Sequence, residues 1–388
     1  MTRKTASRTR GYTESVIRMM TRLAARHDAI NLAQGFPNFP AHDTLKIGAA
    51  RAVYDDINQY AITWGAKRLR DAMIAKYAEW YGMEVDPETE VTVTCGATEA
   101  VVASLLAIVD PGEEVIVLEP FYENYGPDTV LCAAKPVFVP LADDWQIDVD
   151  RLRGAFSERT RAIVVNTPNN PTGRVLTREE LEAIAALCLE FDAYAVTDEV
   201  YEHIVYDGRA HVPLATLPEM RDRTITVSGA SKTFGVTGWR IGTIVAHPEV
   251  TDAIRKVHDF LTVGAAAPLQ EGVAAGLEMM PDSYYRKLGG MYETKRDLFH
   301  AALREAGFRC AAPEGAYYIL ADFSELSELP DDAFARWLTA EIGVAPVPGS
   351  SFFTNPEHGR RLVRFAFCKT DDLLREAAER LASIRARA

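Results

Sequence analysis

The sequence predicts an α/β protein built around a mainly parallel sheet, and two observations lead to this fold class. First, residues 162–165 and 193–196 are short apolar runs separated by residues 178–191, whose apolar side chains recur at helical spacing. This order of strand, helix and strand indicates a βαβ unit. Second, further apolar runs typical of strands buried on both faces occur at residues 91–94, 115–118, 224–227 and 241–245.

The sequence pattern changes after Pro281. Residues 283–307 predict one long polar helix, and residues 315–323 and 362–367 are short segments with alternating apolar and polar side chains. We therefore expect a smaller α+β domain beside the sheet domain. The expected boundaries are residues 45–275 for the large domain, and residues 1–44 with 276–388 for the small domain.

Composition limits the function classes. The chain has 388 residues, 48% of them hydrophobic, and a formal net charge of -13, which argues against a broad surface for nucleic acid or anionic membranes. Its five cysteines are scattered and never in C-x-x-C spacing, so we expect no disulfide framework, no metal site and a cytoplasmic location. The basic residues 1–10 lack an apolar core and predict a tail rather than a transit peptide.

Small and polar residues follow the predicted strands at one common position, the carboxyl end. They are Gly96, residues 166–173, Asp198, Ser228 and Lys232. Ligands of open α/β sheets bind just outside the carboxyl ends of the strands. We therefore expect these residues to converge on one crevice.

Residues 94–100 pass from a predicted strand through Gly96 into a helix. The uncluttered N–H groups of such a helix start can hold a phosphate, although the same pattern is also ordinary packing. Residues 166–173 place two prolines and a glycine around Asn170, which predicts a rigid loop that presents an amide, or a purely structural turn.

Four charged residues are candidates for chemistry. Lys232 lies among small residues eight positions before Arg240; partial desolvation and a second cation would lower its pKa and suit it to Schiff-base formation. Asp198 ends a predicted central strand and needs a cationic partner there, unless it caps a helix. Arg364 alternates with apolar residues in a predicted strand and offers a fork for a carboxylate. The alternatives are a solvated loop lysine for Lys232, a surface ion pair for Arg240 and solubilising charge for Arg364.

Four segments in this order resemble the class I pyridoxal-phosphate aminotransferases of fold type I, over nearly the whole chain. They are N-P-T-G at 170–173, D-E-V-Y at 198–201, S-K-T-F-G-V-T-G-W-R at 231–240 and R-F-A-F at 364–367. The segments N-L-A-Q-G-F-P at 31–37, N-Q-Y at 58–60 and residues 198–206 are most similar to the branch of kynurenine aminotransferase, glutamine transaminase K and methionine aminotransferases. The resemblance implies a sheet of the seven-stranded type.

The resemblance also implies a role for individual residues. Lys232 would carry pyridoxal 5'-phosphate and move the proton, and Asp198 would pair with the ring nitrogen. Asn170 and Tyr201 would hydrogen-bond the ring oxygen, and Tyr122 would stack on the ring. The other expected contacts are Gly96, Ala97, Thr98 and Arg240 to the phosphate, Tyr60 to the phosphate of the neighbouring subunit, and Gly35, Asn170 and Arg364 to the substrate.

The implied protein is a cytoplasmic homodimer with shared active sites that moves the amino group of an L-amino acid to a 2-oxo acid. Aromatic amino acids, methionine, glutamine or kynurenine are the implied donors, and Phe36, Trp64 and Phe352 are candidate pocket walls or simply core. Gly229 departs from the family, in which many members have serine three residues before the lysine; Ser228 or Ser231 could substitute. Alternatives are a β-lyase on the same scaffold and a non-catalytic regulator, which would need a DNA-binding extension.

Overall fold

The computed structural model describes residue 6, residue 9 and residues 14–384. The expected tail, residues 1–10, therefore lies almost wholly outside the described residues. A seven-stranded sheet forms the centre of the molecule, in the order β2-β8-β7-β6-β5-β3-β4. Its strands are β2 (Val91–Thr94), β3 (Glu114–Glu119), β4 (Lys135–Pro140), β5 (Thr160–Asn166), β6 (Tyr194–Asp198), β7 (Thr224–Gly229) and β8 (Gly242–Val245).

The sheet confirms the predicted parallel arrangement, with β8 as its one antiparallel member. β8 runs antiparallel to both β2 and β7, whereas the other neighbouring pairs are parallel. Six of the strands were predicted and β4 was missed. Its two prolines and its half-exposed side chains, at the edge of the sheet, hide the strand pattern.

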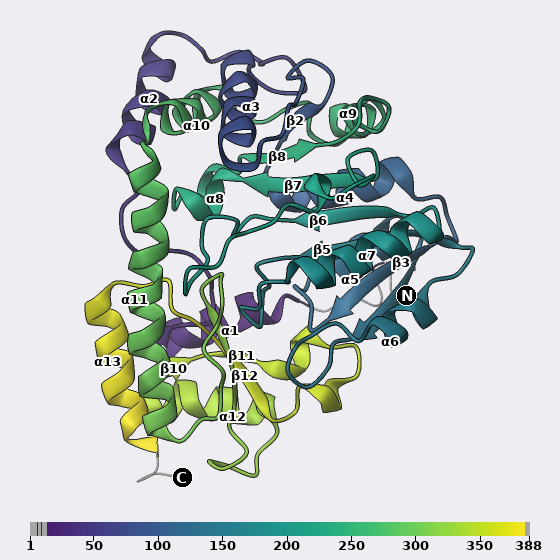
Figure 1. Cartoon of the computed structure of the whole chain (residues 1–388). Helices are drawn as coiled ribbons and strands as arrows, with labels where there is room; N and C mark the ends of the chain where they lie inside the picture. The colour runs from purple at the N-terminus through teal and green to yellow at the C-terminus, as the bar shows by residue number, and fades with distance from the viewer. Residues whose placement is uncertain (1–5, 7–8, 10–13, 385–388) are drawn as a thin grey trace, which may run out of the picture.

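Helices cover both faces of this sheet because successive strand residues point to opposite sides (Figure 1). In β5, Val164 packs toward α4 (Ala97–Ile108), α5 (Tyr125–Leu131) and α9 (Pro248–Thr262), whereas Ile163 packs toward α6 (Val149–Ala155) and α7 (Arg178–Glu190). A third layer joins α2 (Asp43–Tyr54), α3 (Lys67–Tyr81) and α10 (Ala267–Met279) above β2 and β8.

A second core forms below the sheet from the two ends of the chain. α1 (Val16–Arg26) packs with α11 (Asp282–Ala306), α12 (Asp331–Trp337) and α13 (Asp371–Ala382) around the antiparallel strands β11 (Val347–Pro348), β12 (Leu362–Ala366) and β9 (Tyr318–Asp322). β1 (Ile30–Asn31) pairs with β10 (Val344–Ala345). This arrangement agrees with the expected pairing of N-terminal and C-terminal segments; the domain boundaries themselves stay a prediction.

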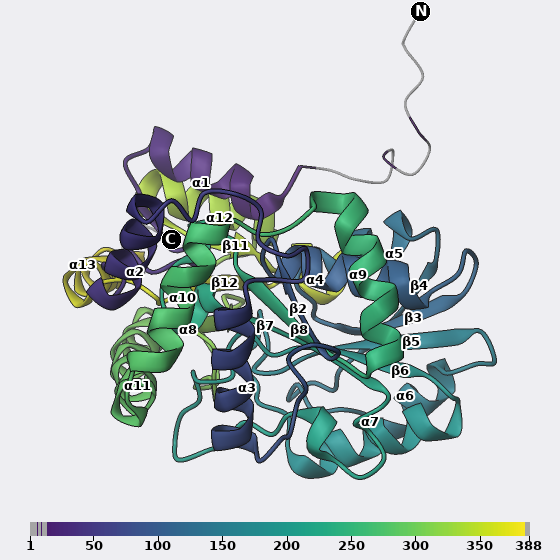
Figure 2. The same ribbon diagram turned by 90° about the horizontal axis from the view of Figure 1, so that it is seen from above.

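Short helical turns complete the chain. They are Leu214–Thr216, α8 (Ala230–Thr233), Thr237–Trp239, Leu338–Ile342, Gly349–Phe352 and Pro356–His358. Figure 2 shows helices flanking the sheet on both sides, and Figure 1 shows α11 running along one edge of the molecule. Within the described ranges, the helices are too short or too polar for any of them to cross a membrane.

Candidate active site

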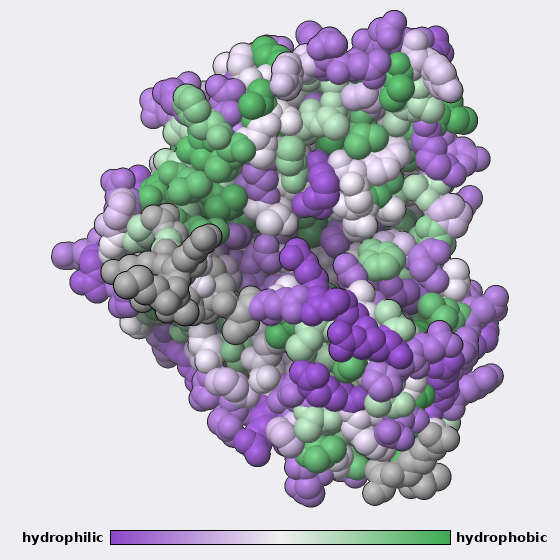
Figure 3. All heavy atoms as spheres, turned by 180° about the vertical axis from the view of Figure 1, so that it is seen from behind, coloured by the Kyte–Doolittle hydropathy of each residue, from purple (hydrophilic) through white to green (hydrophobic). Residues whose placement is uncertain are grey.

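A cleft of about 820 Å³ opens between the carboxyl ends of the sheet strands and the lower core. Its walls come from the loops after β2, β3, β5, β6 and β7, from α1, and from β9 and β12. The space-filling view in Figure 3 shows a hollow between the upper and lower parts of the molecule. The sequence therefore predicted the place of the cleft correctly.

Lys232 lies in α8, the short helix that follows β7, and its ammonium group points into the cleft. Lys232 Nζ lies 3.4 Å from the carbonyl oxygen of Gly35, to which it donates, and 5.6 Å from the ring centre of Tyr201. Burial lowers the pKa of Lys232 to about 8, and the nearby cation Arg240 acts in the same direction. Lys232 is thus a partly buried amine whose lowered pKa lets it lose its proton near neutral pH, rather than a solvated lysine.

Asp198 ends β6 with its side chain only 7% exposed. Tyr125 Oη donates to Asp198 Oδ2 at 2.7 Å, and the Val200 N–H donates to Oδ1 at 3.3 Å. Burial raises the pKa of Asp198, and these two hydrogen bonds oppose the rise. Residues 200–203 form turns and no helix follows directly, so Asp198 does not cap the helix that was the alternative.

The loop between β2 and α4 forms an anion cradle. Gly96 caps α4 with a positive φ of 84° and without a side-chain hydrogen bond to the helix, so the N–H groups at Ala97 and Thr98 face the cleft unblocked. A Cβ at Gly96 would lie 2.1 Å from Arg240 Nη2. Arg240 itself bonds only the carbonyls of Thr237 and Cys95 among the described residues.

The positions around Gly229 indicate which hydroxyl can contribute to this cradle. A Cβ at Gly229 would lie 2.8 Å from the carbonyl oxygen of Ile241, so serine does not fit there without a backbone shift. Ser228 Oγ donates to Glu202 at 2.5 Å, away from the cleft. Ser231 lines the cleft. Ser231 is therefore the candidate that replaces the missing serine.

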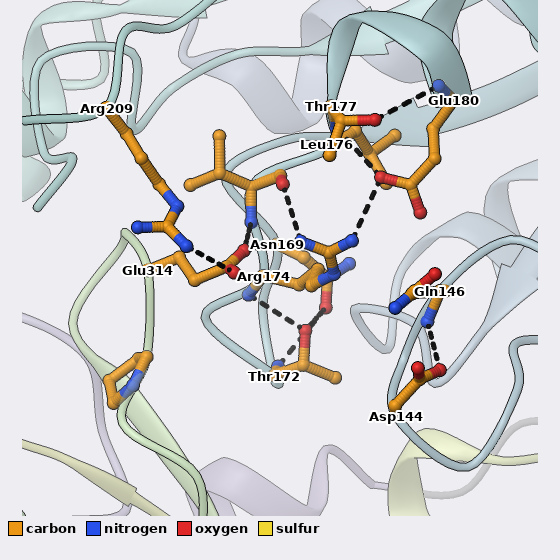
Figure 4. Close-up of polar contacts among 12 residues, drawn as sticks. Asp144, Gln146, Asn169, Thr172, Arg174, Leu176, Thr177, Glu180, Arg209 and Glu314 are labelled. Carbon is orange, nitrogen blue, oxygen red and sulfur yellow. Dashed lines mark hydrogen bonds and ion pairs between the residues drawn. The ribbon is translucent and has the colours of Figure 1, made fainter. Parts of the chain in front are cut away.

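Asn170 lies on a loop that several hydrogen bonds hold rigid (Figure 4). Asn169 Oδ1 accepts from Thr172 Oγ1 at 2.8 Å, and Thr172 Oγ1 in turn accepts from the Arg174 N–H at 3.1 Å. Arg174 Nη1 donates to Glu314 Oε2 at 2.7 Å, and Nη2 donates to Glu180 Oε2 at 3.1 Å. The loop is thus fixed to α7 on one side and to the lower core on the other.

Arg364 in β12 is completely buried yet lines the cleft. Its Nη1 donates to Asn170 Oδ1 at 2.8 Å, and its Nη2 donates to the carbonyl oxygen of Ala33 at 2.5 Å. Its Nε has no hydrogen-bond partner among the described residues, although a buried guanidinium N–H without an acceptor is costly. Aromatic rings of Tyr318 and Phe352 lie 4.4 and 4.9 Å from its guanidinium carbon and hold the group in place.

Tyrosines and Gly35 complete the wall opposite the cradle. Tyr201 Oη lies 2.9 Å from Tyr318 Oη, and Tyr317 Oη donates to the Gly35 carbonyl at 3.0 Å. Tyr122 lines the cleft on the loop after β3. A Cβ at Gly35 would lie 2.1 Å from Tyr318 Oη, so only glycine fits beside this ring.

Three predicted residues lie outside the cleft of their own chain. Tyr60 is 86% exposed on the loop between α2 and α3. Trp64 packs against the guanidinium of Arg255 at 4.8 Å, and Phe352 is buried beneath Arg364. Of the three candidate pocket walls, only Phe36 lines the cleft.

The residues present fit pyridoxal phosphate on grounds of their chemistry. The cradle at Gly96 and Arg240 offers N–H groups and an unpaired cation to a phosphate, and the buried carboxylate of Asp198 suits a protonated ring nitrogen. Lys232 lines the same cleft and offers the amine that attaches to the cofactor aldehyde in this family. Arg364 lines the same cleft and offers a cation to a substrate carboxylate.

Sequence reasoning missed Tyr125, Tyr318 and Asp128. The first lies one helical turn after Tyr122, on a helix that was not predicted, and the second stands in a predicted strand without a motif. Asp128 lines the cleft and is 6% exposed, and its Oδ2 has no hydrogen-bond partner within the described ranges. Burial raises the pKa of Asp128 to about 7.

Asp128→Asn is expected to stabilise the protein in a pH-dependent way. The folded carboxyl keeps its proton up to about pH 7, whereas the unfolded one ionises near pH 4. The wild type therefore loses about 1.4 kcal/mol of unfolding free energy per pH unit between these values, which the variant avoids. Urea unfolding should be measured from pH 4.5 to 8.5. The unfolding free energy of the variant minus that of the wild type should grow with pH and then become constant near pH 7. The exposed Asp143→Asn is the control; equal slopes for both variants would contradict this account.

Comparisons with known proteins agree with this geometry. Residues 27–381 match the family model described as aminotransferase class I and II. The chain is 40% identical to a probable N-succinyldiaminopimelate aminotransferase of Mycobacterium tuberculosis, over 97% of this chain and 98% of that protein. It is 35% identical to kynurenine–oxoglutarate transaminase 1 of Homo sapiens, over 93% of each chain.

A solved structure extends the similarity to three dimensions. The methionine aminotransferase of Escherichia coli is 36% identical, with a TM-score of 0.95 over 98% of this chain and 100% of that chain. The fold type I architecture and the predicted branch are confirmed, while the succinyldiaminopimelate relative was not anticipated. This family uses pyridoxal phosphate to act on amino acids and 2-oxo acids. The chain belongs to the class I and II aminotransferase family and is itself an aminotransferase.

Proposed function

We propose that this aminotransferase binds pyridoxal 5'-phosphate at Lys232 and moves the amino group of a neutral, bulky L-amino acid to a 2-oxo acid by a ping-pong mechanism. The observation that carries the proposal is the convergence of Lys232, Asp198, Arg240 and Arg364 on one cleft. Each of the four has a chemically distinct task. The five cysteines, all free, fit a cytoplasmic enzyme.

When bound, the cofactor supplies an aldehyde for the amino group and a ring that withdraws electrons from the substrate α-carbon. The Arg364 guanidinium, which lines the cleft, would hold the substrate carboxylate through the N–H groups of Nη1 and Nη2 that do not donate to Asn170 and Ala33. Asn170 Oδ1 accepts from Arg364 Nη1, which leaves Asn170 Nδ2 to donate to an acceptor in the cleft. Both groups would orient the α-carbon.

Lys232 would then move the proton at the α-carbon. Its lowered pKa, about 8, leaves part of the amine uncharged near neutral pH, as a general base requires. Tyr201 stands beside it and would donate to the ring oxygen, with its own hydroxyl held by Tyr318. Thr98, Ser231 and Arg240 would keep the phosphate in place during these movements.

We also propose a homodimer in which Tyr60 reaches the phosphate of the neighbouring subunit. The loop that carries Tyr60 lies against the end of α9, because His258 Nε2 and the Thr63 carbonyl oxygen are 2.9 Å apart. Large apolar side chains are exposed on both segments, as on an interface rather than a free surface. They are Tyr54, Ile57, Tyr60, Ile62, Phe260, Leu261 and Val263.

Phe260→Asp is expected to break this dimer. Phe260 is 91% exposed, so a charge there leaves the isolated chain intact but is buried without a partner in a dimer. Sedimentation should give twice 42.9 kDa for the wild type and 42.9 kDa for the variant. The control Leu329→Asp, on the distant lower core, should stay dimeric. A monomeric wild type would refute the shared site.

A panel of amino acids tests the function itself. Each of twenty L-amino acids is added to the cofactor-loaded protein without a 2-oxo acid, and the visible absorbance is followed. Neutral, bulky donors should bleach the absorbance with release of one 2-oxo acid per subunit, and a second 2-oxo acid should restore it. No bleaching by any amino acid would refute transamination.

The β-lyase alternative differs in its products. Given a cysteine S-conjugate and no 2-oxo acid, a lyase releases pyruvate over many turnovers, because elimination regenerates the starting enzyme. A transaminase stops after one turnover per subunit. Pyruvate in excess of the subunit concentration would therefore favour the lyase.

A further inference from the structure

A buried ion pair lies beside the anion cradle, and the proposed function gives it no task. Glu99 belongs to the first turn of α4, two residues after Ala97, and lines the cleft although it is only 8% exposed. His258 in α9 is completely buried, and its Nδ1 lies 2.7 Å from Glu99 Oε1. The pair therefore joins α9 to the helix whose N-terminus would hold the phosphate.

Glu99 keeps the turn of the cradle in place. Its Oε2 accepts from the N–H of Cys95, the residue before Gly96, and its Oε1 accepts from Thr262 Oγ1 at 2.7 Å. The turn is thus built on a carboxylate, although the cradle is to hold a phosphate with about two negative charges. Two anions on one cleft wall repel each other unless a cation stands beside one of them.

The hydrogen bonds of His258 assign a proton to each of its ring nitrogens. Nε2 lies 2.9 Å from the carbonyl oxygen of Thr63, and a carbonyl only accepts, so Nε2 donates. Nδ1 faces a carboxylate that also accepts from an N–H and a hydroxyl, and an ionised carboxylate only accepts, so Nδ1 donates as well. His258 is an imidazolium in this arrangement.

The surrounding groups favour this ion pair. Burial lowers the pKa of His258, but the hydrogen bond and the charge of Glu99 outweigh burial and raise that pKa above its ordinary value. Burial raises the pKa of Glu99, but its donors His258, Thr262 and Cys95 outweigh burial and lower that pKa. Asp259 also favours the imidazolium, and burial raises the pKa of the Cys95 thiol, which stays neutral. The pair therefore carries two opposite charges and is neutral as a whole.

We infer that His258 is a positioning residue for the cofactor phosphate, because its imidazolium neutralises the carboxylate on which the phosphate cradle is built. This inference rests on the proposed function, in which the cradle at Gly96 and Arg240 holds that phosphate. Glu99 shapes the turn, His258 cancels the charge of Glu99, and the guanidinium of Arg240 attracts the phosphate unopposed. An ion pair that merely fastened α9 to α4, the ordinary alternative, would affect every ligand alike.

His258→Gln removes the cation and keeps a polar side chain. Pyridoxal 5'-phosphate and pyridoxal, which lacks the phosphate, are titrated separately into cofactor-free protein, and absorbance gives the Kd of each. The Kd of pyridoxal 5'-phosphate should rise about tenfold and that of pyridoxal by less than about twofold, because only the phosphate meets the uncompensated charge of Glu99.

His211→Gln is the matched control. His211 is also a buried histidine, with its Nε2 2.8 Å from Glu199 Oε2, but neither member of this pair lines the cleft. Both Kd values should therefore stay within about twofold of the wild type in this variant.

A double variant separates charge from packing. His258→Gln combined with Glu99→Gln removes both charges, so the Kd of pyridoxal 5'-phosphate should return to within about threefold of the wild-type value. A pair that serves packing alone predicts a loss at least as large as in His258→Gln. Thermal unfolding of the cofactor-free proteins is measured first. If the unpaired carboxylate of Glu99 prevents His258→Gln from folding, the double variant carries the test.

The outcomes distinguish failure of this inference from failure of the proposed function. Equal rises of both Kd values in His258→Gln overturn the role of His258. So does a double variant that binds pyridoxal 5'-phosphate more than about tenfold more weakly than the wild type. If the wild type binds pyridoxal 5'-phosphate no more tightly than pyridoxal, the cradle and with it the proposed function fall instead. A phosphate-specific loss that the double variant repairs supports the inference.

Discussion

Lys232→Ala is expected to lower kcat by at least about 10⁴-fold, because it removes the covalent attachment and the proton carrier together. The visible absorbance of the lysine-bound cofactor should vanish as well. Stability should change little, since the ammonium makes only one long hydrogen bond to the part of the chain that the structure describes, at 3.4 Å to Gly35. Rates with the best amino donor, absorbance spectra and thermal unfolding together measure these effects.

Lys232→Arg is the matched control for charge. It keeps a cation in the cleft but cannot attach the cofactor, so it should lose turnover and absorbance as completely as the alanine variant. Activity retained in either variant would remove Lys232 from the chemistry. Loss of folding in both would leave the spectra meaningless, so unfolding is measured first.

Asp198→Asn is expected to lower kcat by about 10²–10³-fold, because a neutral amide no longer stabilises the protonated ring nitrogen. Tyr125 donates to one oxygen of Asp198 and Val200 donates to the other, so the amide must also present its NH₂ to one donor. The affinity for the cofactor should fall in parallel, which titration of cofactor-free protein measures.

Tyr125→Phe provides the graded comparison. It keeps the charge of Asp198 and removes one hydrogen bond, so it should cost about tenfold in kcat. Equal losses in the two variants would mean that packing, and not the charge of Asp198, matters here. An Asp198→Asn variant with wild-type kcat would contradict the assignment.

Much of the fold was predictable because buried strands have a distinctive pattern. β2 begins and ends where predicted, and β5, β6 and β7 differ only at their ends. The edge strand β4 was missed because half-exposed strands with prolines resemble loops. The antiparallel direction of β8 was not predicted, because an apolar run carries no sign of its direction.

The site was predictable where a residue type stands in a distinctive local context. Lys232, Asp198 and Asn170 follow strands, so their convergence follows from the geometry of a parallel sheet. Asp128 lies on helix α5, whose register toward the cleft depends on tertiary packing, which one sequence does not reveal. Its raised pKa arises from burial, a property of the folded molecule.

Borohydride trapping followed by peptide mass spectrometry tests the central claim most directly. The reagent reduces the bond between cofactor and amine, so the label stays on the residue that carried it. The account predicts one label per subunit, on the peptide that contains Lys232, and none after prior incubation with an amino donor. A label on another lysine, or no label on loaded protein, would contradict it.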